Sequence, residues 1–100
     1  MRRSTKALAI SKSVKEAVYR RDGGCCVLCG SPYGAPNAHY IARSQGGLGI
    51  EKNVVTLCAW CHREYDQTYR RKAIREELRG YLMSRYPDWN ERDLIYRKGM

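Results

Sequence analysis

The sequence predicts a small α+β domain, and three observations lead to this expectation. The chain has only 100 residues, with four of its five cysteines in two CxxC pairs. Short β-rich segments lie between the pairs, and a long helical pattern follows them. A chain of this length buries a modest fraction of its surface, so a bound metal often supplements the core. We therefore expect one small domain with flanking helices and a metal staple.

The N-terminal part is expected to contain a basic arm and then a helix. Residues 1–12 are rich in Lys, Arg and Ser and are predicted to form a flexible basic arm. Ser13, followed by Glu16, has the pattern of a capping box at the start of a helix. Gly23 and Gly24 are expected to end that helix.

Two strands and a helix are expected in the remainder of the chain. Residues 38–42 and 53–57 have strand patterns, and a glycine-rich loop over 44–52 joins them. From about Ala59 the pattern is helical, and Pro87 is expected to terminate it. The domain should therefore span 13–86.

Beyond this domain, residues 87–100 are expected to form a C-terminal tail. Asn90 is placed to cap a last short helix, and Trp89, Leu94 and Ile95 are apolar. We therefore expect the tail to pack back on the domain.

The cysteines are spaced as in a structural zinc site. Cys26 and Cys29 form one CxxC pair, and Cys58 and Cys61 form another after 28 intervening residues. Each CxxC turn can supply two corners of a tetrahedron, so two turns close a four-cysteine site that leaves zinc no open position. Buried free thiols or a redox pair are the alternative. Cys25 is expected to be a bystander.

The charge of the chain favours a polyanionic partner. Its net charge is +9, with seven basic and two acidic residues over 1–24 and ten basic and seven acidic residues over 63–100. Neutralising phosphates with such side chains releases counterions, which drives binding to nucleic acid. A solubilising surface is the other explanation of a basic surplus.

Targeting signals are not evident in the sequence. No apolar stretch has the length of a signal-peptide core or a membrane-spanning helix. We therefore expect a cytoplasmic location and no membrane partner. Thiols stay reduced there, which favours metal binding by the paired cysteines over disulfides.

Two histidines and an asparagine complete a pattern around the second cysteine pair. It consists of the first pair, the run Ala38-His39-Tyr40-Ile41-Ala42-Arg43-Ser44-Gln45-Gly46-Gly47, and the run Asn53-Val54-Val55-Thr56-Leu57-Cys58-Ala59-Trp60-Cys61-His62. Over about residues 20–66 this pattern resembles the His-Asn-His (HNH) endonucleases of the ββα-metal, or His-Me finger, type. Small phage and prophage nucleases are similar. The resemblance implies a ββα-metal core and an enzyme that hydrolyses DNA phosphodiester bonds.

The resemblance also implies a role for each residue of the pattern. His39 matches the general base that activates water, Asn53 braces the loop that aims the base, and His62 matches a ligand of the catalytic cation, Mg²⁺ or Mn²⁺. The chemistry is consistent with these roles, because a histidine of near-neutral pKa can take a proton from water. A divalent cation can stabilise the leaving oxygen. A purely structural histidine is the alternative at each position.

One position departs from the family pattern. The family usually has a metal-binding His, Asp or Glu immediately before the base, where this chain has Ala38. Asp66, four residues after His62 and on the same helix face, is one candidate replacement, and Asn37 is the other nearby oxygen donor. A site with His62 and Asp66 alone would hold its cation weakly until DNA phosphate supplies further ligands.

Arginines near the pattern are expected to contact DNA phosphates: Arg43, Arg63, Arg70 and Arg71. For those in the C-terminal helical segment, a solvated charged face is the alternative. Two other functions stay open. The chain could be a non-catalytic zinc module that binds DNA, or an accessory subunit of a larger packaging or restriction enzyme.

Overall fold

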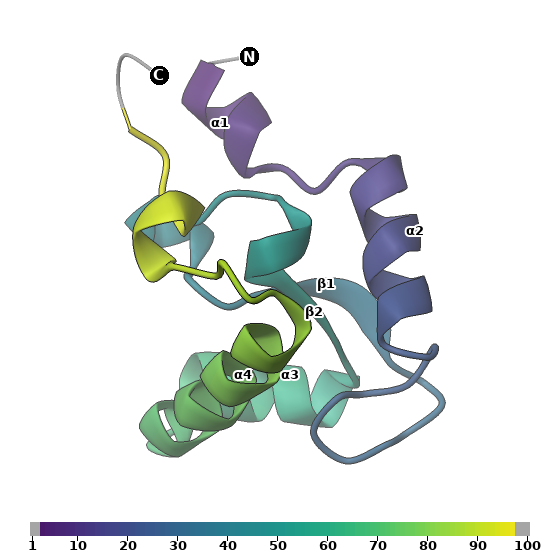
Figure 1. Cartoon of the computed structure of the whole chain (residues 1–100). Coiled ribbons are helices and arrows are strands. Elements are labelled where there is room, and N and C mark those ends of the chain that lie inside the picture. Colours follow the sequence, from purple (N-terminus) through teal and green to yellow (C-terminus); the bar gives the residue numbers. More distant parts are fainter. Residues whose placement is uncertain (1–2, 98–100) are drawn as a thin grey trace.

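The computed structural model describes residues 3–97, so residues 1–2 of the predicted arm and 98–100 of the predicted tail lie outside the described residues. The main elements in chain order are α1 (Arg3–Leu8), α2 (Lys12–Arg21), β1 (Ala35–His39), β2 (Val54–Leu57), α3 (Ala59–Gln67) and α4 (Arg71–Arg85) (Figure 1). Short 3-10 helices complete the chain: η1 (Arg43–Gln45), η2 (Glu51–Asn53) and η3 (Glu91–Leu94). The predicted small α+β class is confirmed.

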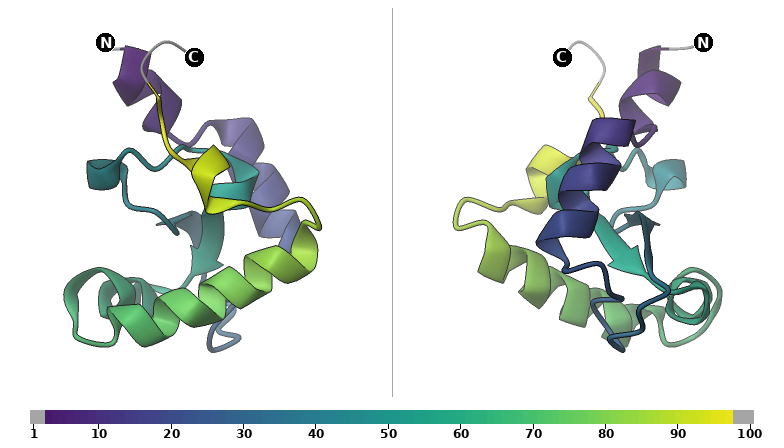
Figure 2. Two further views of the ribbon diagram at one scale, coloured as in Figure 1. Left: turned by 60° about the vertical axis from the view of Figure 1, so that its left-hand side comes forward. Right: turned by 90° about the vertical axis from the view of Figure 1, so that its right-hand side faces the viewer.

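The two strands form an antiparallel hairpin at the centre of the molecule. His39 pairs with Val54 and Ala38 with Val55, and the register is irregular between Ala35 and Ala38. Every residue of β2 is buried. Helix α2 contacts both strands and α3 contacts β2 and α4, so the hairpin lies between α2 and the α3–α4 pair (Figures 1 and 2).

The first helices differ from the prediction in two ways. Helix α2 is capped by Ser11, whose hydroxyl accepts from the Val14 amide at 3.2 Å, so the predicted cap at Ser13 is wrong. The Ser13 hydroxyl lies instead 3.1 Å from that of Ser11. Residues 3–8, within the predicted arm, form α1, a helix that the polar composition did not indicate.

The predicted β1 and C-terminal helix have different bounds in the structure. Strand β1 ends at His39 rather than at 42, because the Ile41 amide is bonded to the side chain of Asn53 rather than to a strand backbone. The single helix expected from Ala59 is two helices. Thr68 separates them: its hydroxyl donates to the Glu64 carbonyl and accepts from the Arg70 amide, at 2.6 and 3.1 Å.

The C-terminal segment packs against the rest of the core. Leu94 is fully buried, and Trp89 meets the ring of buried Tyr40 edge to face at 5.4 Å. As expected, Asn90 caps η3 through its side chain. In all views α1 and the chain that follows η3 lie on the side opposite α3 and α4 (Figure 2). None of the helices in the described part is long and apolar enough to cross a membrane.

Candidate functional site

Four cysteine side chains converge between the loop after α2 and the start of α3. The Sγ atoms of Cys26, Cys29, Cys58 and Cys61 all lie within 4.8 Å of one another. Those of Cys29 and Cys58 are 3.7 Å apart. Zn–S bonds of about 2.3 Å would separate two tetrahedral ligands by about 3.8 Å. The cluster therefore fits a zinc ion, as the spacing predicted.

Backbone hydrogen bonds set the shape of both cysteine turns. In the first turn, the Gly30 amide donates to the Cys26 carbonyl at 2.8 Å, and Gly30 has a φ of +80°. The Val27 amide donates to the Thr56 carbonyl at 3.0 Å, which ties this turn to β2. In the second turn, the sulfur of Cys58 caps α3. A metal here would thus join the loop, the hairpin and α3, and Cys25 lies outside the cluster.

The thiols of the cluster differ in acidity. Burial disfavours the Cys26 thiolate. Hydrogen bonds from backbone amides, of which that of Cys58 has the largest effect, outweigh burial and lower the pKa of Cys26 to about 7. Burial, followed by hydrogen bonds with the other three cysteines, raises the pKa of Cys61 well above its usual value. Because four thiolates in one small volume repel each other, a bound divalent cation is the natural way to ionise the whole set.

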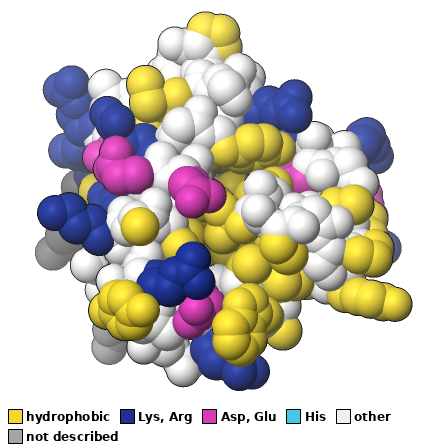
Figure 3. All heavy atoms as spheres, turned by 90° about the horizontal axis from the view of Figure 1, so that it is seen from below, with side chains coloured by type: hydrophobic (Ala, Val, Ile, Leu, Met, Phe, Trp, Pro, Cys, Tyr) yellow, Lys and Arg dark blue, Asp and Glu magenta, His cyan; other side chains and the backbone are white. Residues whose placement is uncertain are grey.

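The outer side of the cysteine cluster carries both apolar and charged side chains. Leu28, Trp60 and Ile74 line a pocket beside the cluster together with the charged Glu64, Arg70 and Glu77, and 64% of the surface of Trp60 is exposed. Seen from below, hydrophobic side chains gather at the centre of this face with Lys and Arg around them, and no histidine is visible (Figure 3). The two histidines belong to a different part of the surface.

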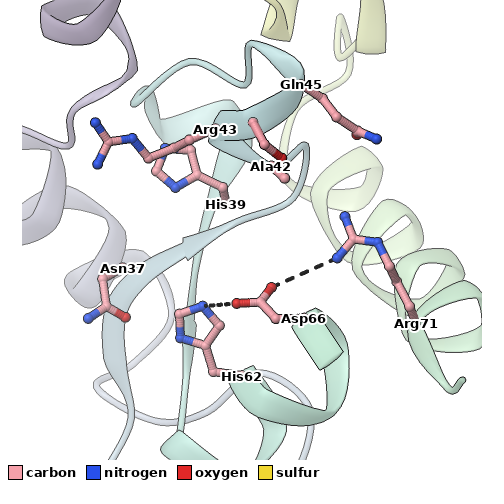
Figure 4. Close-up of a pocket in the computed structure, with 9 residues that line it drawn as sticks. Asn37, His39, Ala42, Arg43, Gln45, His62, Asp66 and Arg71 are labelled. Carbon is pink, nitrogen blue, oxygen red and sulfur yellow. Dashed lines mark ion pairs between the residues drawn. The ribbon is translucent and has the colours of Figure 1, made fainter. Parts of the chain in front are cut away.

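Both histidines line a polar pocket of about 500 Å³. Strand β1 contributes His39 and α3 contributes His62 and Asp66 (Figure 4). Two arginines of the predicted DNA-binding set, Arg43 in η1 and Arg71 at the start of α4, line the same pocket. Residues that are far apart in the sequence therefore meet in one pocket.

The strand geometry shows that the side chain of Ala38 points away from the histidine pocket. Successive side chains of a strand point to opposite faces. Asn37 and His39 both line the pocket, whereas Ala38 is fully buried in the hydrophobic core. A carboxylate or histidine in place of Ala38 would thus point away from the pocket in this hairpin. Both candidate replacements, Asp66 and Asn37, lie in the pocket.

His62 and Asp66 form a pair one helical turn apart on α3. The Nε2 atom of His62 is 3.1 Å from the Oδ2 atom of Asp66. Arg71 approaches the same carboxylate at 3.8 Å and donates to the Tyr65 carbonyl at 3.1 Å. Within the described residues, the cysteines are the only cluster of three or more His, Cys, Asp or Glu groups. Of the three His and Asp side chains that line the pocket, only His62 and Asp66 therefore lie close enough together to share a cation.

His39 is half-buried and held by the N-terminal segment. Its Nε2 atom lies 3.0 Å from the carbonyl oxygen of Leu8. Because a carbonyl can only accept, Nε2 carries the proton and Nδ1 is left with a free lone pair. Burial lowers the pKa of His39, the bond to Leu8 opposes this, and the positive charge of Arg43 adds to the lowering. At neutral pH His39 is therefore an uncharged imidazole.

The side chain of Asn53 holds the loop that follows His39 through hydrogen bonds to its backbone. This side chain is completely buried. Its Oδ1 accepts from the Ile41 amide at 2.8 Å, and its Nδ2 donates to the carbonyls of Ile41 and Leu48 at 3.2 and 2.8 Å. Asn53 does not line the pocket. It fixes both ends of the loop that carries Arg43.

The other two predicted DNA-binding arginines do not line this pocket. Arg70 pairs with Glu64 at 3.0 Å and lines the pocket near Trp60, and Arg63 is exposed on α3. Sequence reasoning missed Lys15, which lines an adjoining pocket of about 310 Å³ together with His39 and Arg43. Only the path of the N-terminal segment reveals this neighbourhood, and no local sequence signal marks it.

Comparisons with known proteins do not place the chain in a family. No protein-family model matches it, and no curated protein matches it either. The function must therefore be argued from the cysteine cluster and the histidine pocket.

Proposed function

We propose that this protein is a divalent-metal-dependent endonuclease of the HNH type that hydrolyses DNA phosphodiester bonds. The observation that supports this most is the convergence of His39, His62 and Asp66 on one pocket flanked by arginines. The resemblance of the sequence around Asn53 and the cysteine pairs to ββα-metal nucleases points to the same chemistry.

In this proposal His39 is the general base. Its neutral form and its free Nδ1 atom suit it to take the proton of an attacking water. Arg43 has an exposed side chain at the mouth of the same pocket, where it can bind a phosphate oxygen. By resemblance, the cut leaves a 5′-phosphate and a 3′-hydroxyl.

His62 and Asp66 are the residues that would hold Mg²⁺ or Mn²⁺. Their ligand atoms are 3.1 Å apart, close to the roughly 3.0 Å expected between adjacent ligands of an octahedral ion with bonds of about 2.1 Å. When bound, the cation supplies charge stabilisation to the leaving oxygen. Two protein ligands leave coordination positions for water and phosphate.

The four-cysteine site is joined to this pocket through the first turn of α3. His62 directly follows Cys61, and its amide donates to the Cys58 carbonyl at 2.9 Å. A zinc ion bound by the cysteines would therefore fix the first turn of α3 and the direction of His62.

One observation favours a second candidate, a zinc module that binds DNA without cutting it. Asp66 is already flanked by His62 and by the guanidinium of Arg71, so its charge is partly neutralised within the protein. The same basic surface would then bind phosphates and hold no catalytic cation.

Cleavage of supercoiled plasmid across Mn²⁺ concentrations separates these candidates. We expect His39→Ala to lose about 10²- to 10⁴-fold in rate, the usual effect of losing a general base, and added metal should not restore it. His62→Ala and Asp66→Ala should instead raise the Mn²⁺ concentration needed for half-maximal rate, and high Mn²⁺ should partly rescue them.

Glu76→Ala serves as the control, since Glu76 is exposed on α4 outside the pocket and should leave the rate unchanged. A wild-type protein that binds plasmid but nicks it with neither Mg²⁺ nor Mn²⁺ would favour the binding module. Cleavage by His39→Ala at the wild-type rate would show that His39 is not the base.

A further inference from the structure

The N-terminal segment reaches the histidine pocket through its backbone. The carbonyl of Leu8, the last residue of α1, is the hydrogen-bond partner of His39 at 3.0 Å, across 31 positions of sequence. Ala9 and Ile10, which follow, line the pocket that adjoins His39. The sequence predicted a flexible basic arm over residues 1–12, but Leu8 within it is bonded to the proposed base.

The N-terminal segment packs directly against Gly49. The Gly49 amide donates to the Ala7 carbonyl at 3.1 Å. A Cβ atom on Gly49 would lie 2.1 Å from the carbonyl oxygen and 2.5 Å from the carbonyl carbon of Ala9. Both are backbone atoms, so no side-chain rotation could relieve the clash. Only glycine allows residues 7–9 to approach the loop this closely.

The loop that carries Gly49 is itself firmly held. Asn53 binds the Leu48 carbonyl, and the Leu48 amide donates to the Leu94 carbonyl at 2.8 Å. Residues 7–9 therefore rest on a platform that is fixed by the core and by the C-terminal segment. The position of the Leu8 carbonyl relative to His39 is set by this platform.

We propose that residues 7–9 position the side chain of His39. The Leu8 carbonyl, held in place by the close packing of this segment against Gly49, keeps His39 in its Nε2–H tautomer. This hydrogen bond keeps the proton off Nδ1, which is the only ring nitrogen then able to accept a proton from water. The contact itself is a property of the structure, whereas its catalytic value rests on the proposed nuclease function.

The tautomer can be measured in the full-length, zinc-loaded protein without any cleavage assay. Long-range ¹H–¹⁵N correlation spectra near neutral pH distinguish the two tautomers of a neutral histidine, and His39→Gln assigns the signals. We expect His39 to show the Nε2–H form. An Nδ1–H form, or a mixture of the two, would overturn the proposal.

Gly49→Ala tests whether the packing of residues 7–9 against Gly49 positions the Leu8 carbonyl, with Gly80→Ala as its matched control. A Cβ on Gly80, in α4, meets nothing within 4 Å. We expect Gly49→Ala to abolish the tautomer preference and to lower kcat by about 10- to 100-fold, the scale of a misplaced catalytic group, with KM little changed. Gly80→Ala should do neither. Zinc content and cooperative unfolding of both variants confirm that the fold is retained.

Two results would overturn the proposal on this variant. One is an unchanged Nε2–H signal in Gly49→Ala, and the other is a lost tautomer preference with an unchanged kcat. A wild-type protein that shows the Nε2–H form yet cuts no DNA would instead refute the proposed function, and with it the catalytic value of this contact.

Discussion

Two buried polar residues beside the hairpin show how differently a hydrogen-bonding group can be accommodated. Asn53 is fully buried and makes three side-chain hydrogen bonds to the loop after β1. Thr56 in β2 is just as buried, but its hydroxyl oxygen finds no hydrogen-bond partner among the described residues. A buried polar group stabilises a fold only when it is paired. Asn53 should therefore stabilise this protein, and the Thr56 hydroxyl should not.

Asn53→Ala and Thr56→Val should consequently change stability in opposite directions. Removing the Asn53 amide leaves the Ile41 amide and two carbonyls without partners, which should cost roughly 2–4 kcal/mol. Replacing the Thr56 hydroxyl by a methyl group of similar size should be neutral or stabilise by up to about 1 kcal/mol. Urea unfolding of the zinc-loaded proteins measures both. A destabilised Thr56→Val would mean that its hydroxyl is paired, for instance with a buried water.

Among the elements, the two cysteine turns connect the main parts of the fold. The first turn is bonded to β2 through Val27, and the second caps α3 through Cys58. The loop before β1, the hairpin and α3 therefore meet at one point. In a chain of 100 residues the hydrophobic core alone is small, so a metal at this point should carry much of the stability.

Removing zinc should therefore unfold the domain. Structural zinc sites bind with about 10–16 kcal/mol, more than the stability of a typical small domain. We expect one zinc per chain, loss of cooperative unfolding on chelation, and unfolding or aggregation of the Cys26→Ser or Cys61→Ser variant. Cys25→Ser, whose thiol lies outside the cluster, is the matched control. Metal analysis and circular dichroism test this, and a stable zinc-free protein would contradict it.

The elements also show which parts of the structure the sequence could reveal. The cysteine pairs and the hairpin between them were predictable, and so was the placing of His62 and Asp66 on one helix face, because spacing and helical periodicity act locally. The meeting of His39 with these two residues was implied only by the family resemblance. The break at Thr68 and the cap at Ser11 depend on which of several competing side chains bonds the backbone. The placement of Leu8 on His39 depends on how the chain folds back in space, which no local pattern encodes.

At the scale of the whole molecule, the net charge of +9 is less informative than where the charges lie. Lys15 and Arg43 are exposed beside the histidine pocket. Arg63 and Arg70 are exposed elsewhere, and Arg70 is paired with Glu64. If DNA binds along the two adjoining pockets, only the first pair of cations meets phosphates. If the charge surplus alone attracts DNA, both pairs contribute equally.

Salt dependence separates these two modes of binding. The variants Lys15→Gln/Arg43→Gln and Arg63→Gln/Arg70→Gln remove the same charge, and both are made on His39→Ala so that DNA stays intact. Each phosphate contact adds about 0.9 to the slope of log affinity against log salt. The first variant should therefore flatten the slope by about 1.8 and the second hardly at all, because only the first pair of side chains borders the pocket where the scissile phosphate would lie. Fluorescence anisotropy with a short duplex gives both slopes. Equal flattening of the slope by the two variants would show that DNA is held by the overall charge. The adjoining pockets beside His39 would then not be the binding surface.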